Sequence, residues 1–477
     1  MHHALLVGLA ATTAAAGHVS IPFSRQKFSH PRAHVKRDDE PFALEALNNI
    51  TGGGYYSEFA VGTPPQNISF LLDTGSSDTW VNSVDANLCN SQSQQATLGF
   101  CQTQFDPEQS DTFEMLDRGG FDITYLDTRN IQGDYFEDTV TIGDMEIKEQ
   151  QLGLALRSVR TTGIMGLGFN INVAADEPYP TIVDNMVEQG FIESAAYSLY
   201  LNDLATDAGN ILFGGIDRNK FVGDLAVLPL IRDATFGSTD ITSFNVKIEG
   251  FDLRDPDGNR AVDLTDLKSG AILDSGSTIS LLPDGQVQDL WEELGVMSFQ
   301  NVIAPFIDCA YAGEKGRGYM FEFRFDGKTI RVPMDEMVID AYADVQDLIS
   351  QEPSFRDWDG ACMFGIGSTG DFGIDNDQFT LLGATFLRSA YVVYDLANEQ
   401  LAIAQANLNS TDSDIVEITS GKLPDVTGVD RSSANDGLNG AGADEDDDED
   451  DAAAGIAPPA MLALTALGLL GSLMVAL

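Results

Sequence analysis

Short apolar runs separated by turn-forming residues dominate the chain over residues 54–405. The runs are rich in Val, Ile, Phe, Tyr and Leu, and Gly, Pro, Asn and Asp stand between them, which is typical of strands joined by turns. Residues 58–61 and 68–72 predict the two strands of one hairpin. Helical periodicity is brief and is clearest at 181–189 and 289–294. The pattern therefore predicts an all-β protein.

An internal repeat divides this region into two similar halves. Residues 70–77 read FLLDTGSS, and residues 271–278 read AILDSGST. In both, an apolar strand leads into an aspartate and a turn containing Gly and Ser. A second echo follows in each half, GIMGLG at 163–168 and LLG at 381–383. Because repeated units indicate repeated structure, the sequence predicts a pseudo-twofold molecule in which each half offers one carboxyl group.

These residues resemble the pepsin-like aspartic endopeptidases. The resemblance implies a bilobal, all-β, pepsin-like fold with an N-terminal lobe at 54–230, a C-terminal lobe at 231–408 and a substrate cleft between them. A single Asp-[Ser/Thr]-Gly triplet is weak evidence for this family. Two triplets, each preceded by an apolar strand and followed by a downstream echo, are specific evidence for it. The alternative is two unrelated turns whose aspartates cap helices. Within the family, the two ends of the chain resemble the fungal yapsin-type surface enzymes.

The repeated aspartates, Asp73 and Asp274, are the candidate catalytic pair. Two carboxyl groups at about 3 Å cannot both ionise, because each negative charge raises the pKa of the other group. The pair therefore holds one proton, so that its ionised member is a general base and its protonated member a general acid. This chemistry needs no metal or other cofactor. All five histidines precede residue 38, so mechanisms that need His are excluded for a chain that matures after Arg37.

Six residues next to the aspartates are expected to support them: Thr74, Gly75, Ser76, Ser275, Gly276 and Ser277. The glycines allow the backbone to turn tightly and to approach the pair. The resemblance implies that the Thr or Ser after each aspartate hydrogen-bonds across the twofold axis. It also implies that the serine after each glycine binds the outer carboxylate oxygen.

Residues 121–125 alternate like a strand and are expected to enter a flap over the substrate. The resemblance matches Tyr125 to the family's flap tyrosine and Trp80 to the tryptophan that orients it, and the alternative is that both are core aromatics. The family's flap tip commonly contains glycines, whereas residues 125–129 read YLDTR. Asp127 at this tip predicts a preference for Lys or Arg before the cut bond, unless it is a solvated loop charge.

The N-terminal end carries two predicted processing segments. Residues 1–17 contain a short apolar, small-residue stretch that predicts a signal peptide. Residues 18–37 are basic and end in Lys36-Arg37, which predicts a propeptide with a dibasic cleavage site. A basic propeptide is able to hold an acidic cleft shut by charge attraction. The alternative is a solvated linker.

The C-terminal end predicts a stalk and an anchor. Residues 409–455 are rich in Ser, Thr, Asp, Asn and Gly and include eight consecutive acidic residues at 444–451, so a disordered acidic stalk is expected. Small residues and an apolar terminal run at 456–477 match the signal for a glycolipid (GPI) anchor. A tail-anchored helix is the alternative. The expected location is the outer face of the plasma membrane or the cell wall, reached by the secretory pathway.

Charge and covalent features agree with this picture. The net charge of −48 repels nucleic acid and fits an enzyme that works in acid, although solubility alone also explains it. Four cysteines predict two disulfides among three possible connectivities, and neighbours in order are expected to pair, as Cys89–Cys101 and Cys309–Cys362. Three sequons predict glycosylation, at Asn49, Asn67 and Asn409.

The overall prediction is a monomeric, secreted and surface-anchored aspartic endopeptidase that acts on protein or peptide substrates with basic residues. A protease of broad specificity and a catalytically silent surface-binding or wall protein on the same scaffold are the alternatives. The intact aspartates, glycines and serines of both turns count against the silent protein.

Overall fold

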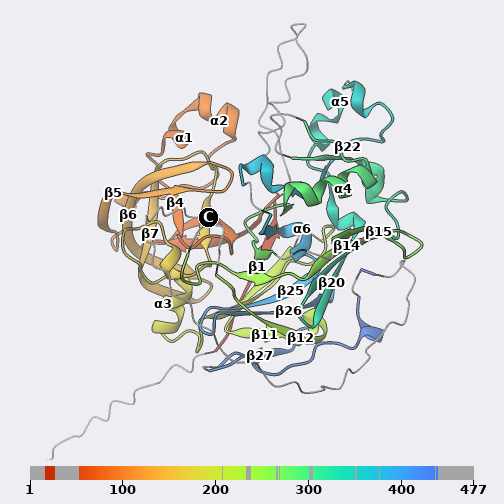
Figure 1. Ribbon diagram of the computed structural model, residues 1–477. Helices are drawn as coiled ribbons and strands as arrows, with labels where there is room; N and C mark the ends of the chain where they lie inside the picture. Colours follow the sequence, from red (N-terminus) through yellow and green to blue (C-terminus); the bar gives the residue numbers. More distant parts are fainter. Residues whose placement is uncertain are drawn as a thin grey trace, which may run out of the picture.

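Two lobes stand side by side on a shared sheet in the computed structural model (Figure 1). The structure describes residues 17–26, 53–206, 208–232, 238–264, 267, 269–299, 304–349, 352–374, 377–419, 421–435 and 437–438. The N-terminal lobe is drawn in orange and yellow, and the C-terminal lobe in green and teal. Strands predominate in both lobes, so the prediction of a bilobal all-β fold is confirmed.

The strands of the first half are β1 (Val19–Arg25), β2 (Tyr55–Val61), β3 (Gln66–Asp73), β4 (Trp80–Asn82), β5 (Glu114–Thr124), β6 (Asn130–Ile142), β7 (Met145–Arg157), β8 (Gly163–Gly166), β9 (Ala196–Tyr200), β10 (Ala208–Phe213), β11 (Gly215–Asp217) and β12 (Phe221–Pro229). Those of the second half are β13 (Asn245–Lys247), β14 (Gly250–Arg254), β15 (Arg260–Leu264), β16 (Gly270–Leu273), β17 (Ser280–Leu282), β18 (Phe306–Asp308), β19 (Met320–Phe325), β20 (Lys328–Pro333), β21 (Val338–Ile339), β22 (Ala361–Phe364), β23 (Ile366–Ser368), β24 (Phe379–Leu382), β25 (Ala390–Asp395), β26 (Gln400–Ala406) and β27 (Ile415–Glu417).

The α-helices of the described chain are short: α1 (Asn87–Asn90), α2 (Gln92–Leu98), α3 (Ile182–Glu188), α4 (Asp284–Leu294), α5 (Gln346–Ile349) and α6 (Ala384–Leu387). The two longest predicted helices are found as α3 and α4. Thr181 precedes α3 and forms a capping box with Asp184, which satisfies backbone donors that a helix start leaves free. Gly295 ends α4 in the left-handed conformation, where glycine has no steric cost.

A thirteen-stranded sheet runs through the whole molecule in the order β12-β26-β25-β9-β10-β1-β2-β3-β8-β4-β7-β6-β5. One end of this sheet belongs to the N-terminal lobe, and the other end lies beneath both lobes. The C-terminal lobe adds three smaller sheets, β13-β16-β24-β17-β23, β15-β14-β19-β20 and β18-β22-β21. The predicted hairpin is present as β2 and β3, which pair in antiparallel register.

The sequence repeat corresponds to a repeat of strand topology. In the first half β3 pairs with β8 in parallel and β4 pairs with β8 in antiparallel fashion. In the second half β16 and β24 form the parallel pair, and β17 and β24 the antiparallel one. A Cβ on Gly166 would lie 2.3 Å from the carbonyl carbon of Ser77, and a Cβ on Gly383 2.3 Å from the carbonyl oxygen of Ile279. The glycines of the second echo therefore let each strand pass close behind the aspartate turn.

The predicted propeptide begins inside the large sheet. Strand β1 lies between β10 and β2 and pairs with β10 from Val19 to Ser24. Lys36 and Arg37 lie outside the described residues, as does the signal stretch before Gly17. Cleavage after Arg37 would therefore leave β1 hydrogen-bonded to the sheet until another segment replaced it.

The chain after residue 408 is ordered over a longer stretch than its composition predicts. Strand β27 pairs with β11, and Val429 forms a bridge with Val222. Ile418 and Leu423 are buried against an apolar cluster on the shared sheet. The prediction of a disordered stalk beginning at residue 409 is therefore wrong for the described residues up to 438, because scattered apolar side chains in a polar segment find a partner surface. The acidic run and the predicted anchor signal lie outside the described residues.

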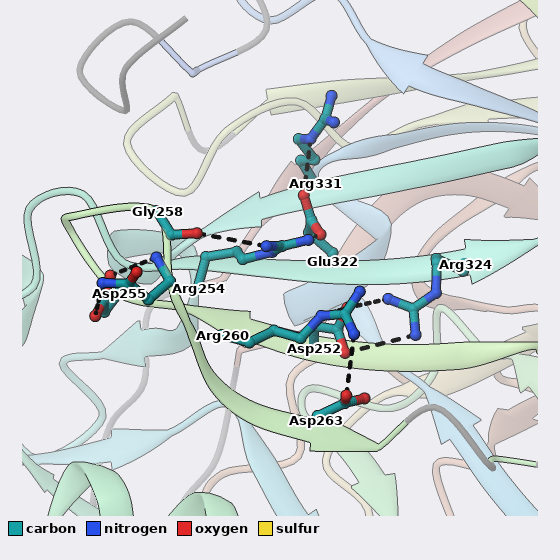
Figure 2. Close-up of polar contacts among 10 residues, drawn as sticks. Asp252, Arg254, Asp255, Gly258, Arg260, Asp263, Glu322, Arg324 and Arg331 are labelled. Carbon is teal, nitrogen blue, oxygen red and sulfur yellow. Dashed lines mark hydrogen bonds and ion pairs between the residues drawn. The ribbon is translucent and has the colours of Figure 1, made fainter. Parts of the chain in front are cut away.

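Charged side chains line the four-stranded sheet of the C-terminal lobe (Figure 2). Asp252 stands opposite Glu322 on β19 and opposite Asp263 on β15, and like charges in such positions destabilise a sheet. Arg260 and Arg324 both form ion pairs with the buried Asp252. Arginines inserted between the carboxylates thus offset their repulsion and allow the strands to pair.

Both disulfides join the cysteines that were expected to pair, Cys89 with Cys101 and Cys309 with Cys362. Among the described residues, no helix has the length and apolar character required to cross a membrane.

Replacing Ile418 by Ala should lower the free energy of unfolding by about 2–4 kcal/mol, because the change leaves a cavity in the cluster that the C-terminal segment closes. Urea denaturation of the folded chain measures this value. Thr419→Ala, next to it and exposed, is the control and should stay within about 0.5 kcal/mol of the parent chain. Equal stability of the two variants would show that the segment is not part of the folded domain.

Candidate active site

The two candidate aspartates are delivered by equivalent strands. Strand β3 ends at Asp73, and β16 ends at Leu273, directly before Asp274. The side chains of Leu72 and Leu273 are fully buried, so each strand is anchored in the core of its own lobe. Asp73 is 5% exposed and Asp274 is 8% exposed. The repeat therefore brings one nearly buried carboxyl group from each lobe to the lobe boundary.

Four hydrogen bonds tie the two aspartate turns together. The hydroxyl of Thr74 donates to the carbonyl of Leu273 at 2.9 Å and accepts from the backbone N–H of Ser275 at 2.9 Å. In the mirror arrangement, the hydroxyl of Ser275 donates to the carbonyl of Leu72 at 2.8 Å and accepts from the N–H of Thr74 at 3.2 Å. These buried groups have the cross-axis contacts that the resemblance implies.

Each carboxyl group is also held from the outside by a serine. The hydroxyl of Ser76 donates to Oδ2 of Asp73 at 2.5 Å, and that of Ser277 donates to Oδ2 of Asp274 at 2.5 Å. Both serines follow the glycine of their turn, so the pattern is the same in the two lobes. The other oxygen of each carboxyl group is left to face the twofold axis.

The glycines of the turns lie against the partner lobe's aspartate. The N–H of Gly75 donates to Oδ1 of Asp73, and the N–H of Gly276 donates to Oδ1 of Asp274. A Cβ on Gly75 would lie 2.6 Å from Cγ of Asp274, and a Cβ on Gly276 would lie 2.2 Å from Oδ1 of Asp73. Any larger residue would therefore push the carboxyl groups apart.

Burial and mutual repulsion set the protonation of the pair. Burial is the main cause, followed by the negative charge of Asp274, and together they raise the pKa of the Asp73 carboxyl to about 7. A Cβ on Gly276 would lie 2.2 Å from Oδ1 of Asp73 and 3.1 Å from Oδ1 of Asp274, so the two carboxyl groups lie close together and cannot both be ionised. The pair is thus able to provide a base and an acid in the same place.

The predicted flap is a hairpin made by β5 and β6 with its turn at residues 125–129. At the start of this turn, the hydroxyl of Tyr125 accepts a hydrogen bond from Nε1 of Trp80 at 2.7 Å. Trp80 is fully buried and Tyr125 is 8% exposed. Both side chains are therefore core aromatics, and they also hold each other at the edge of the site, since Tyr125 borders the cavity above the aspartates.

Asp127 lies at the flap tip but is not a solvated charge. Its Oδ2 accepts a hydrogen bond from Arg160 at 3.0 Å and lies 3.7 Å from Nε of Arg129. Its Oδ1 accepts from the N–H of Arg129 and fixes the turn. The carboxylate borders the cavity as the sequence predicts, but two of the chain's own arginines compensate its charge.

Asp73 and Asp274 both border a cavity of about 300 Å³ whose walls come from both lobes. Its apolar lining includes Tyr56, Leu71, Ile164, Ile272, Leu281 and Met363. Apolar walls around a few polar groups are typical of sites that bind organic ligands. The cavity can therefore hold side chains of an extended peptide next to the carboxyl pair.

Two charged residues near the site, Arg160 and Asp78, were not predicted from the sequence. Arg160 lies in the loop between β7 and β8 and borders the cavity. Asp78 is fully buried and accepts hydrogen bonds from the hydroxyls of Tyr135 and Tyr179 at 2.8 and 2.6 Å. Burial raises the pKa of the Asp78 carboxyl, although these hydrogen bonds oppose the shift. Asp78 follows the end of β3 and Arg160 follows the end of β7, and the sequence around them carries no pattern that identifies their partners.

Two of the three predicted glycosylation sites, Asn67 and Asn409, have exposed side chains, and Asn49 lies outside the described residues. Within the described parts of the chain, no group of three or more His, Cys, Asp or Glu side chains is arranged to hold a metal ion.

Comparison with known proteins agrees with this geometry. The family model for eukaryotic aspartyl protease matches residues 54–406. The chain is 35% identical to a probable aspartic-type endopeptidase OPSB of Arthroderma benhamiae, over 79% of this chain and 73% of that protein. It is 32% identical to the probable aspartic-type endopeptidase opsB of Aspergillus fumigatus, over 89% and 84% of the two chains. It is 28% identical to the aspartic proteinase yapsin-3 of Saccharomyces cerevisiae, over 85% and 76%.

The match covers both lobes, both aspartate turns and the flap, so it includes every part of the site described above. The chain belongs to the eukaryotic aspartyl protease family and is an aspartic-type endopeptidase.

Proposed function

We propose that Asp73 and Asp274 are the catalytic pair of this endopeptidase and that they cleave peptide bonds by activating a water molecule. The observation that carries this assignment is the close approach of the two carboxyl groups, one from each lobe, which both border the same cavity. No other described pair of acids has this combination of symmetry, burial and access to a cavity formed by both lobes.

The shared proton defines the steps of the reaction. The ionised carboxylate takes a proton from water while the water oxygen attacks the peptide carbonyl carbon, and the protonated carboxyl donates its proton to the carbonyl oxygen. The C–N bond of the resulting tetrahedral diol then breaks as the protonated carboxyl gives its proton to the leaving nitrogen and the other carboxylate takes a proton from a hydroxyl of the diol. The pair ends with one proton, as it began. Hydrogen bonds from Ser76 and Ser277 keep the carboxyl groups oriented throughout.

An acidic working pH is part of the proposal. The pKa of Asp73 is raised to about 7, and burial also raises the pKa of Asp78 and of Glu336. A carboxyl group whose pKa is higher in the folded chain stabilises the fold below its unfolded pKa, and this contribution is lost as pH rises through the folded pKa. Both the reaction and the fold are therefore favoured in acid.

We also propose a preference for Lys or Arg before the cut bond. Asp127 borders the cavity at the flap tip, and a net charge of −48 attracts basic chains. Pairing of Asp127 with Arg160 and Arg129 reduces the charge that a substrate meets. The preference is therefore expected to be modest.

The ends of the chain support a place at the cell surface. A signal peptide, a propeptide ending at Arg37, an acidic stalk and a glycolipid-anchor signal are all proposed from the sequence. Since ordered structure extends to residue 438, the stalk is proposed to begin after this point. A catalytically silent surface protein would need none of the precise support that surrounds the two carboxyl groups.

Replacing Asp274 by Asn should reduce kcat/KM by about a thousandfold or more, because the pair then lacks an ionisable member. Cleavage of a fluorogenic peptide at about pH 4, with and without pepstatin, measures the loss. Asp289→Asn on the exposed face of α4 is the control and should retain full activity. Full activity in Asp274→Asn, or a parent enzyme without pepstatin-sensitive cleavage, would contradict the assignment.

Replacing Asp127 by Asn should lower the ratio of kcat/KM for a Lys peptide to that for a Leu peptide by about threefold or more, since the flap tip loses its negative charge. The two peptides differ only in the residue before the cut bond. Asp122→Asn, in the same hairpin but exposed and outside the cavity lining, should leave the ratio unchanged. An unchanged ratio in Asp127→Asn would mean that this carboxylate does not contribute to the preference for Lys before the cut bond.

A further inference from the structure

The carboxylate of Asp127 at the flap tip is already paired with a guanidinium of the enzyme, that of Arg160. The Nη2 atom of Arg160 donates to Oδ2 of Asp127 at 3.0 Å. Arg160 is distant from the flap in sequence, since it lies in the loop that leads into β8, the strand beside the first aspartate. The ion pair therefore bridges the flap and the wall of the cavity.

The backbone of Arg160 is fixed so that its side chain reaches the flap. Its carbonyl accepts hydrogen bonds from Nδ2 of Asn82 at 3.1 Å and from the hydroxyl of Ser158 at 3.0 Å. Its N–H donates to the same hydroxyl at 3.1 Å. The main chain of Arg160 is thus held through both its carbonyl and its N–H group.

The guanidinium lies over the aromatic ring of Tyr125, 4.7 Å from the ring centroid. Cation–π contact of this kind is favourable and orients the guanidinium plane. Arg160 is 22% exposed and Asp127 is 28% exposed, so a ligand in the cavity can reach both groups. Arg160 thus contacts two flap residues, Tyr125 and Asp127, that border the cavity.

The ion pair of Arg160 and Asp127 has features that allow a substrate cation to replace Arg160. A single hydrogen bond joins the two groups, in place of the paired geometry that makes Arg–carboxylate contacts strong, and Nε of Arg160 is buried without a partner in the described part of the chain. Arg129 adds a second positive charge 3.7 Å from the same carboxylate. Together, Asp127, Arg129 and Arg160 therefore carry one net positive charge before any substrate binds.

We propose that Arg160 is a specificity-determining residue. Its guanidinium binds Asp127 in the position that a substrate's Lys or Arg would take, and it so limits the preference for basic residues. This inference rests on the proposed function of Asp127. A basic substrate side chain must displace Arg160 and meet its positive charge, whereas an apolar side chain leaves the pair intact. Removing Arg160 frees the carboxylate for the substrate.

The test compares Lys, Leu and Glu peptides that are otherwise identical, cleaved by the parent enzyme and by Arg160→Met. The Lys-to-Leu ratio of kcat/KM should rise about fivefold in the variant, and the Glu-to-Leu ratio should fall, because one positive charge leaves the site. Arg160→Lys, which keeps the charge, should stay close to the parent ratio. Arg157→Met, at an exposed arginine outside the cavity lining, is the control and should change the ratio by less than twofold.

A merely structural role predicts a different result. If Arg160 only supports the flap, Arg160→Met lowers kcat/KM for all three peptides equally and leaves the ratios unchanged, which would overturn the proposal. In the double variant Arg160→Met with Asp127→Asn, the gain for the Lys peptide should disappear; a gain that persists would also overturn it. Failure of the catalytic assignment is separate, because it would appear as the absence of pepstatin-sensitive cleavage of every peptide.

Discussion

The structure depends on the reciprocal hydrogen bonds between Thr74 and Ser275. Each hydroxyl donates to a carbonyl of the other lobe and accepts an N–H from it. Buried polar groups are costly to leave unpaired, so the two turns stabilise only one relative position of the lobes. That position places the carboxyl groups of Asp73 and Asp274 in contact. The proton that the pair shares, and the raised pKa of Asp73, are consequences of this constraint.

The remaining structure keeps the two turns from moving apart. A sheet common to both lobes lies beneath them, and the segment around Ile418 and Leu423 covers an apolar cluster on that sheet. Above the carboxyl pair, the flap is held by the bond from Trp80 to Tyr125 and by the ion pair of Arg160. The carboxyl pair is thus held by buried hydrogen bonds from both lobes, whereas the flap tip is held by an ion pair that a basic substrate side chain is proposed to displace.

Much of the fold and of the site could be predicted because both depend on a short sequence motif that occurs twice in the chain. An aspartate turn repeated at residues 70–77 and 271–278 identifies the carboxyl pair, its supports and the pseudo-twofold fold together. What could not be predicted depends on partners distant in sequence. Arg160 meets Asp127 only after β7 and β8 are placed, and Ile418 is buried only because the shared sheet offers an apolar surface. Composition alone therefore gave the wrong boundary for the ordered chain.

The pH dependence of kcat/KM tests the shared proton most directly, in the parent enzyme and in Thr74→Val. For the parent, activity should fall as pH rises through about 7, because the pair then loses the proton that makes one carboxyl an acid. In Thr74→Val the two cross-lobe bonds of the Thr74 hydroxyl are lost, the carboxyl groups are held together less closely and this upper limit should move to lower pH. A parent profile that stays flat well above pH 7, or an identical upper limit in both enzymes, would contradict the account.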